Sequence, residues 1–158
     1  MGWTVLHTSA LDGDMKRVRH CVEDIKWLKG IDINAQTEQR GHSALHMCAA
    51  NGHIEVMQYI INADGANKDV QTHQGNTPLH LAAINDREKA CKLLISNGCD
   101  VRVSNKSGKT ADKVCPKDGA LKEFLTKEVQ EALKKSKGRG GAHHQRSYSS
   151  SNQDEDEV

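Results

Sequence analysis

Short apolar clusters recur along this chain, and a polar segment rich in glycine closes each of them. In the clearest case, leucine, alanine and isoleucine occupy residues 79–84 except for His80, directly after Thr77-Pro78. Threonine and proline suit the cap and first turn of a helix. Further apolar residues in 90–94 follow at helical spacing, and Gly98 suits the end of a second helix. The pattern therefore predicts a pair of short helices.

The same plan occurs at least twice earlier in the chain. Its copies are marked by Gly2, Gly41, Gly75 and Gly108, which are 39, 34 and 33 residues apart. A period near 33 residues indicates stacked repeats, in which each helix pair covers its apolar face only with its neighbours. The first copy carries about five extra residues, which end at Gly30 and lengthen its second helix or the loop after it.

Composition supports closely packed helices. Aromatic residues make up only 3% of the chain, so alanine, leucine, isoleucine, valine and methionine must build the core. Such a core suits short stacked helices better than a β-sandwich. We therefore predict an all-α solenoid of about four helix-turn-helix pairs joined by β-hairpin-like loops.

One segment carries a specific resemblance. Residues 77–82, TPLHLA, are similar to the ankyrin-repeat signature T-P-L-H-x-A, and residues 52–56 with 65–70 resemble the second half of that repeat. The resemblance covers about residues 2–133, although copy one carries its insertion and copy four has Asp112-Lys113 in place of Leu-His. It implies repeats at about 2–40, 41–74 and 75–107, a C-terminal cap at 108–133 and a flexible charged tail at 134–158.

A Leu-His pair occurs in three copies and contains His7, His46 and His80. The ankyrin resemblance implies a structural role, in which each ring links the start of a helix pair to the neighbouring turn. A catalytic or metal-binding role would need the rings to converge, whereas stacking places equivalent residues along a line. We therefore expect these histidines to be structural, with no metal site and no catalytic residue.

The C-terminal part of the repeat region predicts an amphipathic helix. Apolar residues between Leu121 and Leu133 recur at helical spacing, opposite charged ones. We expect this helix to cap the stack. A helix that binds a partner or a membrane is the alternative, but its mixed charges and the helix-turn-helix before it favour the cap. At the other end, Trp3 and Trp27 are candidate capping residues.

Charge and cysteine content limit the cellular compartments and the classes of protein to which this chain can belong. The formal net charge is +1, and the five cysteines include no CxxC pair. Such usage is typical of reduced thiols, so we expect a cytoplasmic or nuclear protein. No apolar stretch approaches the ~20 residues that cross a bilayer, and the start lacks the features of a secretory signal. No nucleotide-binding loop or nucleophile motif is present, so we expect neither an enzyme nor a cofactor.

The sequence of the segment after residue 133 is compatible with several functions. The basic run 134–139 suits nuclear import or nucleic-acid binding, but it lacks the aromatic residues that stack on bases. Ser147 and Ser149 resemble sites of a basophilic kinase and Ser151 that of an acidophilic one, and Val158 resembles a PDZ-domain ligand. A tail that only adds solubility is at least as well supported.

The ankyrin resemblance implies that a partner meets the hairpin tips and the exposed ends of the first helices. In this sequence the matching residues are Trp3, Leu11, Asp12, Glu38, Gln39, Arg40, His42, Asn51, Thr72, His73, Gln74, Asn76, Ile84, Asn85, Asn105, Lys106 and Lys109. For Trp3, a capping role is equally supported.

We expect an adaptor that binds another protein, as a monomer or as part of a hetero-complex, with no small-molecule substrate and no membrane partner. Direct inhibition of an enzyme such as a protein kinase is the alternative. Nucleic-acid binding through the basic run is a third and weaker one, because no strong field of one sign is present.

Overall fold

The computed structural model describes residues 4–27 and 32–138, and these form eight helices with no β-strand among them. The helices are α1 (Val5–Asp12), α2 (Met15–Trp27), α3 (Ala44–Asn51), α4 (Ile54–Ile61), α5 (Pro78–Ile84), α6 (Glu88–Ser96), α7 (Ala111–Val114) and α8 (Ala120–Gly138). The predicted all-α fold is confirmed. Trp3, Ser147, Ser149 and Ser151 lie outside the described residues.

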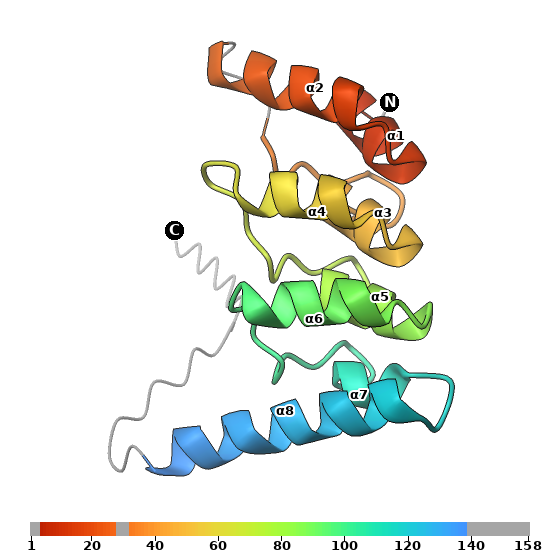
Figure 1. Cartoon of the computed structure of the whole chain (residues 1–158), viewed down its shortest axis with the longest axis vertical. Helices are drawn as coiled ribbons and strands as arrows, with labels where there is room; N and C mark the ends of the chain where they lie inside the picture. The colour runs from red at the N-terminus through yellow and green to blue at the C-terminus, as the bar shows by residue number, and fades with distance from the viewer. Residues whose placement is uncertain (1–3, 28–31, 139–158) are drawn as a thin grey trace, which may run out of the picture.

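The helices form four pairs stacked along the long axis of the molecule (Figure 1). The first helices α1, α3, α5 and α7 pack against one another in a row. The second helices α2, α4 and α6 form a parallel row, and α8 packs against α7 at the end of the stack. Each pair therefore packs mainly against its neighbours, as expected for a repeat solenoid.

Local sequence explains where the first helices begin and end. Thr4, Ser43 and Thr77 each sit in an extended conformation at the N-cap, and each forms a capping box with the histidine three residues on. Gly13 and Gly52 end α1 and α3 in the left-handed conformation, with φ of 72° and 76°. The helices are short because both of their ends are specified by the chain.

Small residues let the first helices approach closely. Two consecutive positions on their facing sides are always small, namely 9–10 in α1, 48–49 in α3 and 82–83 in α5, and all six residues are buried. A larger side chain there would push neighbouring repeats apart, since protein interiors are close-packed. Leucines 6, 45 and 79 fill the space beside these positions.

The insertion in the first repeat lengthens its second helix. α2 has 13 residues, whereas α4 has 8 and α6 has 9. Residues 28–31, which follow α2, lie outside the described part of the chain.

Polar side chains also join the loops that follow the second helices. The Asn34 carboxamide oxygen accepts a hydrogen bond from the Asn67 N–H at 2.8 Å, and the Asp69 carboxylate accepts one from the Asp100 N–H at 2.9 Å. The Gln71 amide donates to the carbonyls of Gly75 and Ser104. These bonds cross from one repeat to the next, so they fix the spacing between repeats.

The helix α8 covers the end of the stack. Leu121 and Leu125 are buried beneath it, while Leu133 is 45% exposed, contrary to its predicted place in the buried stripe. The helix also continues to Gly138, although we expect the flexible tail to begin at residue 134. Lysines 134, 135 and 137 are good helix formers, and positive charge is favourable at a helix C-terminus, which accounts for the extra turn. Of the helices in the described ranges, none is long and apolar enough to span a bilayer.

All five cysteines are free thiols, and four of them are buried in the core. Burial raises the pKa of Cys91 and of Cys99 to about 12. These thiols therefore stay protonated near neutral pH and act as small apolar core residues.

Candidate partner-binding surface

The histidine of each Leu-His pair joins one repeat to the next. The His46 ring Nε2–H donates to the carbonyl of Asn76 at 2.9 Å, while its Nδ1 accepts from the Ser43 N–H at 3.1 Å. The Ser43 hydroxyl lies 2.8 Å from the same Nδ1. One ring therefore holds together the start of α3 and the loop that precedes α5.

His7 and His80 repeat this arrangement. His7 Nε2 lies 2.8 Å from the Ala35 carbonyl and 3.0 Å from that of His42, and His80 Nε2 lies 2.9 Å from the Lys109 carbonyl. Each ring serves a different pair of repeats, so the three histidines form a row. No group of three or more His, Cys, Asp or Glu residues in the described ranges is placed to hold a metal ion.

These contacts favour the neutral imidazole. Burial is the main reason that the pKa of His46 falls from 6.5 to about 4, and burial likewise lowers the pKa of His80. The geometry agrees, because the His46 Nδ1 lone pair already accepts an N–H and has no room for a proton. At neutral pH the rings of His46 and His80 are uncharged donors and acceptors.

The hairpin tips are joined to one another through their backbones. The His73 N–H donates to the Arg40 carbonyl at 3.0 Å, and the Lys106 N–H donates to the Gln74 carbonyl at 3.0 Å. A Cβ on Gly75 would lie 2.8 Å from the Lys106 nitrogen, so only glycine allows this approach. The three tips therefore form a continuous row rather than three independent loops.

Most of the predicted contact residues on this row are exposed. Glu38, Gln39, Arg40, His73, Gln74, Lys106 and Lys109 are exposed, and His42 and Asn105 are half-buried.

Thr72 and Asn76 correct the prediction, because both are buried, with exposures of 6% and 8%. The Thr72 hydroxyl accepts from the Asn76 N–H at 3.2 Å, and the Asn76 side chain accepts from the Asn105 amide at 3.0 Å. Their polar atoms close the hairpin and join it to the next one. They therefore shape the tips from inside and do not present a surface to a partner.

The first helices add an apolar line beside the tips. Leu11, Ala50 and Ile84 occupy equivalent positions near the ends of α1, α3 and α5, and Leu11 and Ile84 are 38% and 39% exposed. The next residues are Asp12, Asn51 and Asn85, of which the first and third are exposed and Asn51 is half-buried. The surface thus combines two apolar side chains with a polar border.

The sequence prediction missed the residues that fix the ends of these helices. The His53 Nε2–H donates to the Leu11 carbonyl at 2.9 Å, and Asn51 donates to the same carbonyl at 3.1 Å. The Arg87 guanidinium donates to the Ala50 carbonyl at 3.3 Å. His53 and Arg87 occupy equivalent positions in neighbouring repeats, because each directly follows a residue with positive φ, Gly52 or Asp86. This equivalence is the feature of the sequence from which their shared role could have been predicted.

The charge on the tips is mainly positive. Three basic residues, Arg40, Lys106 and Lys109, lie on segments 36–42 and 104–109, and Glu38 is the single acidic residue of the three tip segments. Burial, followed by the nearby positive charge of Arg40, lowers the pKa of His42. The tips therefore favour a partner with acidic or hydrogen-bond-accepting groups.

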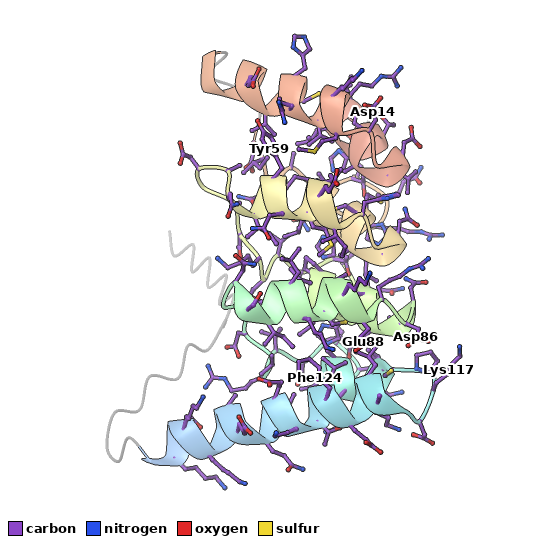
Figure 2. The ribbon with its side chains drawn as sticks, viewed as in Figure 1. Asp14, Tyr59, Asp86, Glu88, Lys117 and Phe124 are labelled. Carbon is purple, nitrogen blue, oxygen red and sulfur yellow. The ribbon has the colours of Figure 1, made fainter. Side chains whose placement is uncertain are left out.

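A separate hollow of about 310 Å³ lies between α2 and α4 and is lined by Val22, Ile33, Tyr59 and Ala63 among others. Tyr59 lies between these helices (Figure 2), and the Arg19 guanidinium carbon is 5.8 Å from its ring centre. This hollow belongs to the second helices, so it is not part of the surface formed by the tips and first helices.

Comparison with known proteins agrees with this architecture. The family model described as "Ankyrin repeats (3 copies)" matches residues 16–105, which is more than half of the chain.

Individual relatives share the same part of the chain. Protein phosphatase 1 regulatory subunit 12A of Mus musculus is 38% identical over 107 residues, which cover 66% of this chain and 10% of that protein. BCL-6 corepressor-like protein 1 of Homo sapiens is 28% identical over 140 residues, which cover 89% of this chain and 8% of that protein. The chain spans about a tenth of the length of these relatives. The repeat architecture and the family match together show that the chain belongs to the ankyrin-repeat family.

Proposed function

We propose that this chain is a non-catalytic module that binds another protein through its hairpin tips and the exposed ends of its first helices. The observation that carries the proposal is the continuous row of tips beside exposed Leu11 and Ile84. A row of repeats presents an extended surface of this kind to macromolecules, whereas a small-molecule site is usually an enclosed cavity.

The chemistry of the surface suits recognition of a folded or extended protein segment. Apolar side chains such as Ile84 supply the burial that stabilises a complex, and Arg40 supplies a planar group for bidentate hydrogen bonds. Exposed amides such as Gln74 and Asn85 form a polar border. Interfaces commonly combine a few anchors of this kind with a polar rim, over about 800 Å² on each partner.

The tips are also organised before any partner arrives. Backbone hydrogen bonds between neighbouring tips already hold their positions. A surface of this kind loses little conformational freedom on binding, so more of the contact energy appears as affinity.

Affinity purification of the full chain with identification of the captured proteins by mass spectrometry tests the proposal. We expect Ile84→Arg and Arg40→Ala each to reduce capture of the same proteins, with the larger loss for Ile84→Arg. Lys89→Ala, an exposed substitution on α6, is the matched control and should capture normally. Unchanged capture by both surface variants would exclude this surface.

Regulation of an enzyme is a second candidate. It is supported by the similarity to protein phosphatase 1 regulatory subunit 12A, a protein whose name describes a regulatory role. Inhibition of a protein kinase is a variant of the same idea. Addition of the purified chain to the protein phosphatase 1 catalytic subunit, and separately to kinases, tests it. A regulator changes turnover, whereas a simple adaptor binds without changing it.

The five free cysteines support a reducing compartment such as the cytoplasm or the nucleus. Lysines 134, 135 and 137 are exposed at the end of α8, where they support nuclear import or a weaker nucleic-acid role. Nucleic-acid binding predicts an affinity that falls steeply with salt and depends on these lysines.

A further inference from the structure

We propose that the tips bind an acidic segment of this same chain, residues 154–157. The cationic tip strip is defined here as Arg40, Lys106 and Lys109, and the segment reads Asp-Glu-Asp-Glu. The effect on partner binding rests on the proposed function, because the segment would then occupy the surface that a partner needs.

Most of the positive charge of the cationic tip strip is uncompensated, because Glu38 is the one acidic residue on the tips. Arg40, Lys106 and Lys109 are exposed, and none of the ion pairs formed within the described ranges involves them. Other basic side chains are already paired, as Arg102 is with Asp100 at 2.9 Å. The strip is therefore a surface whose positive charges remain available to an anionic segment.

The tips are also close enough together to share one short segment. Backbone hydrogen bonds link the tip with Arg40 to that with His73, and the tip with Gln74 to that with Lys106. Neighbouring repeats pack at the ~8–10 Å spacing of packed helices. Four extended residues span roughly 13 Å. The acidic segment therefore reaches from one tip to the next, while the tip with Arg40 lies two such spacings from the tip with Lys106 and Lys109.

The connecting chain is long enough to bring the segment to the tips. α8 has 19 residues, which make a length of about 28 Å, and it begins at Ala120, 11 residues after Lys109 and six after the last residue of α7. Residues 139–153 join the end of α8 to the acidic segment and can extend to about 50 Å. The segment can thus return along α8, and the tether gives it a local concentration in the ~mM range.

Lysines 134, 135 and 137 are the competing site for the acidic segment. They lie on the last turns of α8, where Glu131 is four residues before Lys135 and shares its side of the helix. The tip with Lys106 and Lys109, residues 104–109, carries no acidic residue, so we assign the segment to the cationic tip strip.

Amide NMR spectra of the full chain test this assignment without a partner. The acidic segment is neutralised by Asp154→Asn, Glu155→Gln, Asp156→Asn and Glu157→Gln, all in the full chain. At low salt we expect the amide signals of the cationic tip strip to differ between the wild type and this variant. The difference should disappear at about 0.5 M salt, where charges are screened within a few ångströms.

Two matched variants locate the binding site. With Arg40→Gln, Lys106→Gln and Lys109→Gln, neutralising the acidic segment should leave the tip signals unchanged. With Lys134→Gln, Lys135→Gln and Lys137→Gln, the tip signals should still respond.

The inference is overturned if the tip signals never respond, if only α8 signals respond, or if the response grows with protein concentration, which indicates binding between copies. None of these outcomes tests partner capture, so this inference can fail while the proposed function stands.

Discussion

Asp86 is the one non-glycine residue with a positive φ among the described residues, at 56°. It follows α5 at the position that Gly13 and Gly52 occupy after α1 and α3. Its carboxylate lies 3.4 Å from the Lys117 ammonium (Figure 2), but both side chains are largely exposed. An exposed pair of this kind contributes little stability.

We expect Asp86→Gly to raise the free energy of unfolding by about 0.5 kcal/mol, because glycine removes the left-handed strain. The gain is small since glycine also adds freedom to the unfolded chain. A urea titration measures it. Gly52→Ala, which introduces strain at the equivalent position, should lower stability by about 1 kcal/mol. Equal destabilisation by both substitutions would contradict this explanation.

Protonation of His46 predicts a loss of stability in acid. Its pKa is about 4 in the folded chain and near 6.5 when unfolded, so the unfolded state takes up the proton first. Stability is therefore complete above pH 6.5 and falls as the pH drops towards 4, by about 3 kcal/mol from this residue.

Urea titrations at several pH values test this dependence. His46→Gln should be less stable at pH 7 and should lose less stability between pH 6.5 and 4. If the free energy of unfolding falls equally steeply with pH in the wild type and in the variant, His46 is not the titrating group.

At the scale of single residues, the sequence predicts local conformation well where the chain matches the repeat signature. Thr77 and Gly98 have the predicted capping and left-handed conformations. The sequence fails at Thr72 and Asn76, polar loop residues for which it predicts a place on the surface. Their burial depends on hydrogen bonds to the following repeat, and no local pattern carries that information.

The hairpin elements gain rigidity from the contact between their tips. Gly75 and Gly98 have nearly the same φ, at 79° and 81°, but only Gly75 is crowded by a neighbouring tip. Gly98→Ala should cost about 1 kcal/mol through backbone strain alone. Gly75→Ala should cost about 2 kcal/mol or more, because its Cβ would also collide with the Lys106 backbone.

Thermal or urea unfolding of both glycine variants measures this difference. If the two substitutions cost the same, the tips do not restrain one another as the structure shows.

A similar comparison applies to the capping helix α8, where the cost of a substitution should depend on burial. Leu125 is fully buried beneath it and Leu133 is 45% exposed. Leu125→Ala should lower the free energy of unfolding by about 2–5 kcal/mol, since it leaves a cavity. Leu133→Ala should change it by less than about 0.5 kcal/mol. Circular dichroism during urea unfolding compares them, and similar losses would show that α8 is not packed in this orientation.

The position of α8 could be predicted from the sequence, but its contacts and its end could not. The apolar face of α8 is wider than the part of it that packs on the stack. Helical spacing alone therefore does not identify which of these apolar residues are buried. Phe124 (Figure 2) is only half-buried, and the Lys92 ammonium lies 5.6 Å from its ring centre. The charged residues after 133 suggested a tail, although lysine is compatible with either state.

For the whole molecule, stacking explains both the stability and the arrangement of the proposed binding surface. The histidine, amide and Asx bonds between repeats fix the spacing of the tips, and the small residues at the first helices fix how closely these helices approach. The stack could be predicted from the period, because one repeat cannot bury its apolar face alone. The choice of partner could not, because it depends on a few exposed side chains that the fold does not constrain.

Hydrogen exchange of the chain with and without its captured partner tests the central claim most directly. Binding through the proposed surface should slow exchange of the amides at the hairpin tips and at the exposed ends of α1 and α5. Amides of α4 and α6 should exchange at the same rate in both states. Protection confined to the second helices, with unchanged exchange at the tips, would contradict the account.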